Sequence, residues 1–365
     1  MASIGDTTQA PANPDRLRLW TAVDALADRL LEGGLDERRI RALRGHRVSL
    51  LAAARLRARG EDIPDPLGRD ERTAALVALA IPALLRRVRA AVDGPLMLMK
   101  GPEVAALYPD ALQRPCVDLD LLAADPHDAH RALLAAGFRV LEDIDWPGSH
   151  HHLPPLEWPG LPVAAEVHIR PNWIDGMRPP PVDELFEAAG PSRLGVPGLL
   201  APGSEHHALL LATHAWAHRP LGRLGDLIDV EALSLEADET RLDAVARDWG
   251  CTRLWRSTRR AADDVLATRG SSLALRIWAR HLREGRDRTV LAAHLQRWLA
   301  PAWAVPRRRV FTVTTAAVAR DLLPFGDEGW ARKATRMRRA LADTRIAEAD
   351  HLQRADVVGV ETAQR

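Results

Sequence analysis

Cysteine and lysine are both scarce in this chain of 365 residues. The two cysteines, Cys116 and Cys251, lie far apart in the sequence, so we expect neither a disulfide framework nor a zinc site built from cysteines. Lys100 and Lys333 are the only lysines, and arginine supplies all the other positively charged side chains. Lys100 directly precedes Gly101, which indicates that this position suits a compact ammonium better than a broad guanidinium group.

The chain also lacks a charge excess and long apolar runs. Its formal net charge is +1 at pH 7, so the composition does not predict a long nucleic acid as a partner, because such partners usually require a clear basic excess. No apolar run reaches the roughly 18 residues that a membrane span needs. The segment 1–14 is polar and has no apolar run behind a basic start. We therefore expect a cytoplasmic protein without a membrane partner.

Hydrophobic periodicity divides the chain into three regions. Residues 1–92 are expected to be helical, residues 93–202 to form an α/β unit, and residues 203–365 to be helical again. The expected helices are 16–31, 36–59, 70–92, 101–108, 127–136, 208–218, 224–235 and a run around 273–299, and the expected strands are 96–99, 116–122, 138–141 and 163–169. Pro82 is expected to start or kink a helix. The sequence thus predicts an α+β fold in which a small mixed β-sheet is flanked by N-terminal helices and a C-terminal helical bundle.

Two aspartates in the expected strand 116–122 form the first part of a candidate site. Alternate side chains of a strand share a face, so Asp118 and Asp120 project together, with their Cα atoms about 7 Å apart. The neighbours expected to point into the core are Val117, Leu119 and Leu121. Such a pair suits Mg²⁺, which binds one or two carboxylates together with phosphate oxygens and water. The pair alone does not decide the reaction, because Asp-x-Asp also holds sugar nucleotides in glycosyltransferases.

A third acid, Glu166, lies in the expected strand 163–169. Burying this side chain unpaired among apolar neighbours would be costly. It is expected either to pair with an arginine, such as Arg170 or Arg114, or to join the two aspartates. If its strand lies beside 116–122, three carboxylates converge, which is enough to hold two metal ions.

These residues resemble the nucleotidyltransferase superfamily with a DNA-polymerase-β-like palm, and in particular its uncharacterised bacterial branch with a Lys-Gly motif. The resemblance covers about residues 96–233. It is carried by Leu98-Met99-Lys100-Gly101, Ala105 to Pro109, Arg114, Val117-Asp118-Leu119-Asp120-Leu121-Leu122, Ala136-Gly137-Phe138, His151-His152-Leu153-Pro154-Pro155, Glu166-Val167-His168, His214, Asp226 and Asp229. The chain departs from the superfamily at one turn, where Lys100-Gly101-Pro102 replaces the usual Gly-Ser.

The resemblance implies a nucleotidyltransferase palm and a metal site. Asp118, Asp120 and Glu166 would be the catalytic acids and the metal ligands, with two Mg²⁺ ions expected and Mn²⁺ as the other candidate ion. His152 and His168 are expected on the acceptor side of the site, or as groups that orient a carboxylate.

Nucleotide binding is assigned to three further residues. Lys100 is expected to contact phosphate oxygens, and Gly101 to let the backbone approach them closely. Arg114 is expected to clamp a phosphate, to brace Asp118 or to have a purely structural role.

The histidines leave a zinc site open as another interpretation, because spacings of four and seven place side chains on one helical face. The histidines concerned are His150, His151, His152, His168, His207, His214 and His218. Asp226 and Asp229 are expected to anchor the C-terminal helices against the sheet.

The expected reaction is the transfer of a nucleoside monophosphate from an NTP to an acceptor hydroxyl, with pyrophosphate leaving. Near-neutral charge and the long C-terminal helical region favour a small molecule, a peptide or a protein as acceptor, and the resemblance implies a place in specialised metabolism. Two alternatives stay open. One is a metal-dependent glycosyltransferase using a sugar nucleotide, which should carry a larger α/β region upstream, where this chain has helices. The other is a catalytically degenerate nucleotide-binding or scaffold protein.

Overall fold

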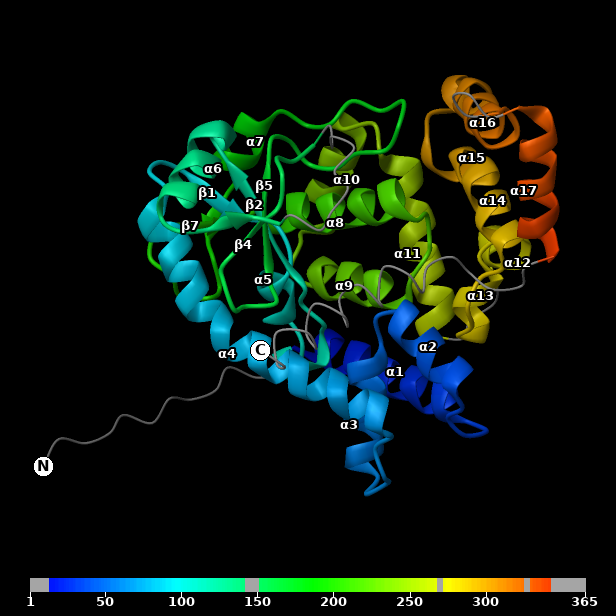
Figure 1. The fold of residues 1–365 in the computed structure, drawn as a ribbon, viewed down its shortest axis with the longest axis horizontal. Coiled ribbons are helices and arrows are strands. Elements are labelled where there is room, and N and C mark those ends of the chain that lie inside the picture. Colours follow the sequence, from blue (N-terminus) through cyan, green and yellow to red (C-terminus); the bar gives the residue numbers. More distant parts are fainter. Residues whose placement is uncertain (1–12, 142–150, 268–271, 325–328, 343–365) are drawn as a thin grey trace, which may run out of the picture.

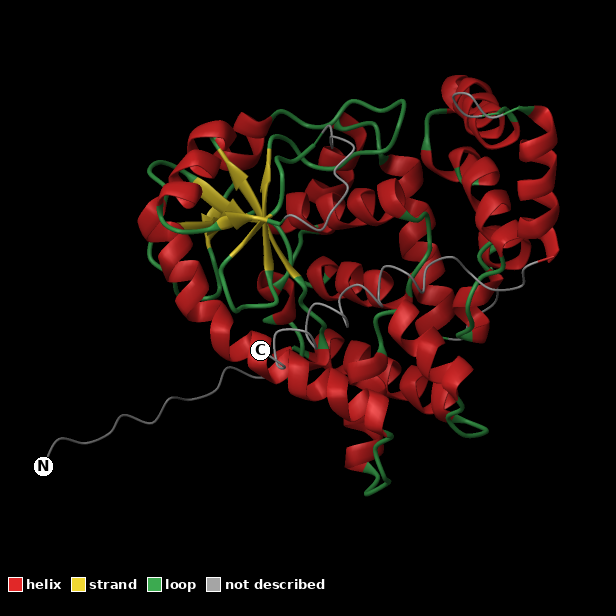
Figure 2. Ribbon diagram, in the orientation of Figure 1, coloured by secondary structure: helices red, strands yellow, loops and turns green. Residues whose placement is uncertain are grey.

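The architecture is a mixed β-sheet surrounded by helices (Figures 1 and 2). A computed structural model describes residues 13–141, 151–267, 272–324 and 329–342 of the chain. The sheet lies at one end of the molecule, the last helices gather at the opposite end, and the first helices run along the lower side in Figure 1. The predicted α+β class, with a mixed sheet flanked by helices, is confirmed.

The helices fall into three groups along the chain. The N-terminal group contains α1 (Pro14–Leu31), α2 (Glu37–Gly45), α3 (Ser49–Ala58) and α4 (Asp65–Ala91). Helices that alternate with strands are α5 (Pro102–Ala105), the 3-10 helix η1 (Ala111–Gln113), α6 (Pro126–Ala135) and α7 (Val182–Glu187). The C-terminal group contains α8 (Ser204–His218), α9 (Leu224–Ser234), α10 (Glu239–Asp248), α11 (Thr252–Leu266), α12 (Leu273–Ile277), α13 (Arg280–Glu284), α14 (Val290–Leu299), α15 (Pro301–Ala304), α16 (Arg307–Leu322) and α17 (Trp330–Ala342). None of the helices in the described ranges has the length and apolar character needed to span a membrane.

Two details of the N-terminal helices differ from the sequence-based expectation. The predicted helix 36–59 is two helices, because Arg47 adopts a left-handed backbone (φ 58°) that turns the chain between α2 and α3. Pro82 lies inside α4, so it does not start a helix, and the kink that was the other expectation stays a prediction. The residues that follow it, such as Leu85 and Val88, are completely buried, and this packing stabilises the helix despite the hydrogen bond that proline cannot make.

The sheet contains seven strands in the order β3-β4-β5-β2-β1-β7-β6. In this order they are Arg139–Val140, Leu156–Glu157, Ala164–His168, Asp118–Ala123, Leu96–Leu98, Leu199–Ala201 and Gly190–Pro191. The central strand β2 is antiparallel to β1 and parallel to β5. The strands β4, β6 and β7 have only two or three residues, too few to give a recognisable alternation in the sequence.

The two faces of the sheet differ in character. On one face, Leu119, Leu121 and Val167 are completely buried in a cluster that includes apolar residues of α4 and α6. The opposite face carries the alternate residues of β2 and β5, and α8 reaches it through a hydrogen bond from His207 to the Met99 carbonyl. The acids of β2 and β5 therefore lie between the sheet and the C-terminal helices.

Val117 is an exception to the predicted alternation. It was expected in the core, but its side chain is 55% exposed. The strand begins only at Asp118, so the pleat that buries Leu119 and Leu121 does not extend back to this residue.

Helices from the two ends of the chain share one apolar core. Helix α1 packs against α9 and α11, and buried residues of all three belong to the same cluster. His46, which follows α2, hydrogen-bonds to the Arg286 carbonyl beyond α13 (3.1 Å). The boundaries proposed at residues 92 and 202 stay a prediction.

Candidate active site

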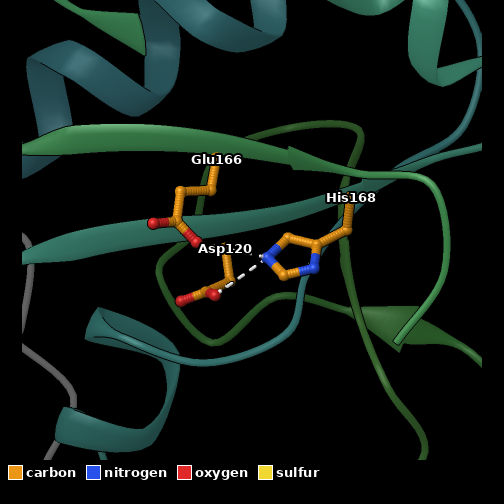
Figure 3. Close-up of side chains that lie close together, drawn as sticks. All are labelled: Asp120, Glu166 and His168. Carbon is orange, nitrogen blue, oxygen red and sulfur yellow. Dashed lines mark hydrogen bonds and ion pairs between the residues drawn. The ribbon is translucent and has the colours of Figure 1, made fainter. Parts of the chain in front are cut away.

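The strand register brings the three acids together. In the parallel pairing of β2 with β5, Asp120 lies directly opposite Glu166, and Asp118 lies two residues earlier on β2. Figure 3 shows the side chains of Asp120 and Glu166 projecting to the same side from neighbouring strands, with His168 beside them. Asp120 is completely buried, whereas Asp118 and Glu166 are partly exposed. The cluster thus has a buried centre and an accessible rim.

Lys100 supplies a positive charge at the centre of this cluster. It follows β1, where the Met99 amide donates a hydrogen bond to the Asp120 carbonyl (2.9 Å). Its Nζ lies 2.9 Å from Asp120 Oδ1 and 3.5 Å from Asp118 Oδ2. The ammonium therefore bridges the two aspartates of the Asp-x-Asp pair.

Two histidines contact the acids from β5 and from the segment beside it. His168 Nε2 lies 3.0 Å from Asp120 Oδ1 and 3.6 Å from Glu166 Oε2. His152 Nε2 lies 3.7 Å from Glu166 Oε2, and its Nδ1 donates to the Leu153 carbonyl (2.8 Å). Asp120 Oδ1 is therefore shared by Lys100 and His168.

The charges in the cluster shift each other's pKa values. Burial opposes ionisation of Asp120, but the Lys100 ammonium and the His168 hydrogen bond hold its pKa well below the usual range. Burial and the charge of Asp120 raise the pKa of Asp118. Burial also opposes ionisation of Glu166, but the hydrogen bond from His168 keeps its pKa low. Asp120 and Glu166 are thus ionised, and they lie beside Asp118, whose charged form is disfavoured by burial.

The same acids raise the pKa values of the two cationic side chains, Lys100 and His168. Burial opposes the charged form of Lys100, but Asp118 and Asp120 together raise its pKa. Burial likewise opposes protonation of His168, but its hydrogen bonds to Asp120 and Glu166 raise its pKa to about 9. Both cations are therefore held charged by the carboxylates.

The donor atoms of Asp120, Glu166 and His168 fit a divalent metal ion. One ligand atom from each residue lies within 4.8 Å of the others. Asp120 Oδ2 is buried and has no hydrogen-bond partner among the described residues, although a buried carboxylate oxygen normally has a partner. A cation at this oxygen would complete its coordination. The two carboxylates suit Mg²⁺ and Mn²⁺, and the imidazole is a ligand that transition-metal ions accept more readily than Mg²⁺ does.

Comparison with known proteins agrees with this geometry. Residues 36–267 match the model of a family described as uncharacterised nucleotidyltransferases. The chain belongs to this family. The match confirms the family expected from the sequence and makes the protein a transferase enzyme, and it includes the whole sheet and all three acids. No curated protein and no solved structure matches the chain.

Gly101 lets the Lys-Gly turn pack directly onto β2. Its backbone has φ +69°, and a Cβ atom at this position would lie 2.8 Å from the carbonyl oxygen of Asp118. A side chain here would therefore strain the backbone and push against the strand that carries the acids. The contact of Gly101 with a nucleotide stays a prediction.

Arg114 holds the same turn from the other side. Its guanidinium donates to both carboxylate oxygens of Asp229 on α9 (2.8–3.0 Å) and to the Gly101 carbonyl (3.0 Å). Tyr108 also donates to Asp229 Oδ1 (2.7 Å). Asp229 thus anchors the C-terminal helices to the sheet region as expected. The hydrogen bonds of Arg114 lead to α9 and Gly101, and its contact with a phosphate stays a prediction.

More histidines line the side of the site that faces α8. The rings of His151 and His168 are 5.6 Å apart, and those of His214 and His218 are 4.5 Å apart. Burial lowers the pKa of His151 to about 3 and that of His218 to about 4, so these rings are neutral near pH 7. His207 instead bonds to the Met99 carbonyl.

Within the described ranges, the group that could hold a metal is the Asp120, Glu166 and His168 set, and His150 lies outside those ranges.

Arg47 is a residue near the site that sequence reasoning missed. It lies on the turn between α2 and α3, and its Nη1 is 4.0 Å from Asp226 Oδ1 at the start of α9. Its positive charge acts on both Lys100 and Asp118. No sequence signal places this arginine near the acids, because the left-handed turn that aims it is not visible in the residue pattern.

Proposed function

We propose that the protein is a Mg²⁺-dependent nucleotidyltransferase that moves a nucleoside monophosphate from an NTP to a hydroxyl of a small molecule, a peptide or a protein. The observation that carries this proposal is the convergence of Asp118, Asp120 and Glu166 beside Lys100, with one buried carboxylate oxygen that no described residue hydrogen-bonds. The family match supports the reaction class.

The acids would hold the metal. Asp120, Glu166 and His168 would be its nearest protein ligands, with Asp118 completing the acidic set from the exposed side. A bound divalent ion would neutralise phosphate charge and make the acceptor hydroxyl more acidic. In the metal-free protein, His168 holds Asp120 through a 3.0 Å hydrogen bond. On metal binding, His168 would release its proton and its neutral imidazole would become a ligand.

The remaining residues act on the substrates. In the proposed reaction, the acceptor oxygen forms a bond to the α-phosphorus, and the bond from that phosphorus to the β-phosphate oxygen breaks, releasing pyrophosphate. Glu166 is partly exposed and ionised, so it accepts the proton of the acceptor hydroxyl, and His152 beside it faces the acceptor. Lys100 stabilises the negative charge that develops on the leaving phosphates.

The experiment that tests this proposal measures transfer of label. The protein is incubated with each of the four α-³²P-labelled NTPs, with Mg²⁺ or Mn²⁺, and with fractionated small molecules and peptides as acceptors. We expect metal-dependent pyrophosphate release together with a labelled product. Asp118→Asn or Asp120→Asn is expected to lower transfer by roughly 10³-fold, which is about 4 kcal/mol of activation free energy.

Asp70→Asn is the matched control. Asp70 is also an ion-paired acid, bound to Arg44, and its side chain is about as exposed as that of Asp118 (22% and 23%). It lies in α4, away from the cluster, so transfer should be unchanged. Full transfer by Asp120→Asn would refute the catalytic assignment.

A thermal-shift screen separates catalysis from simple nucleotide binding. A nucleotide at one hundred times its Kd adds about 2.7 kcal/mol to the free energy of unfolding. A metal-dependent shift without pyrophosphate release for any acceptor would instead indicate a degenerate nucleotide-binding protein. A shift and turnover with UDP-sugars alone would indicate a glycosyltransferase.

A further inference from the structure

Lys100 occupies a position in the acidic cluster where a metal ion would otherwise be expected. Its Nζ lies between the carboxylates of Asp118 and Asp120, at 3.5 and 2.9 Å. Two aspartates on one face of a strand are an arrangement that could hold a cation between them. In this protein the ammonium group of Lys100 already lies between the two aspartates.

The backbone around Lys100 is fixed on both sides. The Met99 amide donates to the Asp120 carbonyl, and the Met99 carbonyl accepts from His207. On the other side, the Gly101 carbonyl accepts from Arg114. The side chain of Lys100 is also largely buried, with 11% exposed. The ammonium is therefore held by the fold, and displacing it would leave two carboxylates without their partner, which is costly.

A second cation position in the cluster remains open. Lys100 and His168 both bind Asp120 through Oδ1, whereas Oδ2 has no hydrogen-bond partner in the part of the chain that the structure describes. Glu166 and His168 bring their ligand atoms within 4.8 Å of Asp120. Asp120 thus has one oxygen that contacts Lys100 and His168 and a second oxygen that can still accept a cation.

We propose that the Lys100 ammonium takes the place of one of the two divalent ions expected from the sequence, so that the protein itself binds a single divalent ion, at Asp120, Glu166 and His168. One ammonium and one divalent ion together balance the charge of three carboxylates. This inference rests on the proposed function, because it concerns the cations of that same site.

The test counts the metal ions that each variant binds. Metal-free protein is titrated with Mn²⁺ alone, and free Mn²⁺ is followed by its electron paramagnetic resonance signal. The wild type is expected to bind one ion per chain. Lys100→Met is expected to bind two, because removal of the ammonium opens the position between Asp118 and Asp120. Asp120→Asn should lose the ion that the wild type binds.

Lys333→Met is the matched control, since it removes the other lysine of the chain. Lys333 is also buried, with 2% exposed, and its Nζ donates to the Asp321 carbonyl far from the acids (2.6 Å). This variant should bind one ion, as the wild type does. If Lys100→Met is unfolded without metal, Mn²⁺ should restore its circular dichroism spectrum, because the ion replaces the lost charge, and failure to do so counts against the proposal.

The outcomes separate this inference from the proposed function. Two ions bound by the wild type, or one ion bound by folded Lys100→Met, would overturn the role given to Lys100, while label transfer by the wild type would still support the nucleotidyltransferase. Absence of Mn²⁺ binding by the wild type, together with absence of label transfer, would overturn both.

Discussion

Two groups of buried charges lie close together in this protein, and they differ in how completely they are satisfied. In the anchor formed by Tyr108, Arg114 and Asp229, both oxygens of Asp229 accept hydrogen bonds, and Arg114 Nη1 donates to the Gly101 carbonyl. In the acidic cluster around Asp120, one oxygen is shared by two cations and the other has no hydrogen-bond partner among the residues that the structure describes.

The difference separates a structural role from a functional one. A buried network in which each group is paired stabilises one arrangement of the chain, because breaking it leaves a charge without compensation. A buried network with an unpaired oxygen keeps a free-energy cost that a ligand can remove. The anchor therefore holds α9 against the Lys-Gly turn, and the acidic cluster is ready to bind a cation.

The largest expected effect is on stability, from breaking the anchor. Asp229→Asn removes the charge that balances Arg114, and burial opposes leaving this guanidinium alone. We expect the free energy of unfolding to fall by about 3–5 kcal/mol, as measured by urea denaturation followed by circular dichroism.

Asp226→Asn is the control for this change, because it lies on the same helix one turn earlier. Its contact with Arg47 is long, 4.0 Å, and partly exposed. We expect a loss below about 1 kcal/mol. Equal losses in the two variants would contradict the distinction between a complete anchor and an ordinary surface pair.

For the acidic cluster, we predict a specific pH dependence of the free energy of unfolding. Hydrogen bonds to Asp120 and Glu166 raise the pKa of His168 to about 9 in the folded, metal-free protein, above about 6.5 in an unfolded chain. The folded state then holds a proton that the unfolded state releases, so this stabilisation is complete below pH 6.5 and is lost as the pH rises through 9. Its size is on the order of 3 kcal/mol. In EDTA, His168→Gln should remove this part of the pH dependence of unfolding.

His207 is the control with the opposite sign. Burial lowers its pKa to about 3, so the unfolded state binds the extra proton, and this histidine destabilises the fold as the pH falls below 6.5. His207→Gln should change the profile only on the acid side. A His168→Gln profile that matches the wild type between pH 6.5 and 9 would show that the acids do not hold His168 protonated.

Part of the acidic cluster and the fold class could be predicted from local residue patterns. Strand alternation placed Asp118 and Asp120 on one face and identified Glu166 as an acid that needed a partner, because a period of two is visible in residues. The α+β class followed from the change of periodicity near residue 93. The register that sets Asp120 opposite Glu166 depends on tertiary packing, so the convergence of the three acids could be predicted only on the condition that the two strands are neighbours.

Contacts across distant segments could not be predicted. Arg114 was expected near a phosphate or Asp118, and nothing in its neighbourhood indicates that Asp229, 115 residues later, is its partner. The backbone turn at Arg47 and the exposure of Val117 depend on where helices and strands end, and element ends are set by packing more than by local propensity.

The smallest expected effect tests the turn that joins the anchor to the acidic cluster. Gly101 and Gly94 both have positive φ, 69° and 79°, but only at Gly101 does a Cβ atom meet backbone, at 2.8 Å from the Asp118 carbonyl oxygen, whereas nothing lies within 4 Å at Gly94. We expect Gly94→Ala to lower the free energy of unfolding by about 1 kcal/mol and Gly101→Ala by about 2 kcal/mol.

Activity should separate these two glycine variants more sharply than stability does. The added methyl group at Gly101 pushes on the strand that carries Asp118, and a shift of about 1 Å in reacting groups can cost about 100-fold in rate. Label transfer by folded Gly101→Ala should therefore fall well below that of Gly94→Ala. Equal transfer rates would mean that the packing of the Lys-Gly turn onto β2 serves only the fold, and that the anchor does not position the acids.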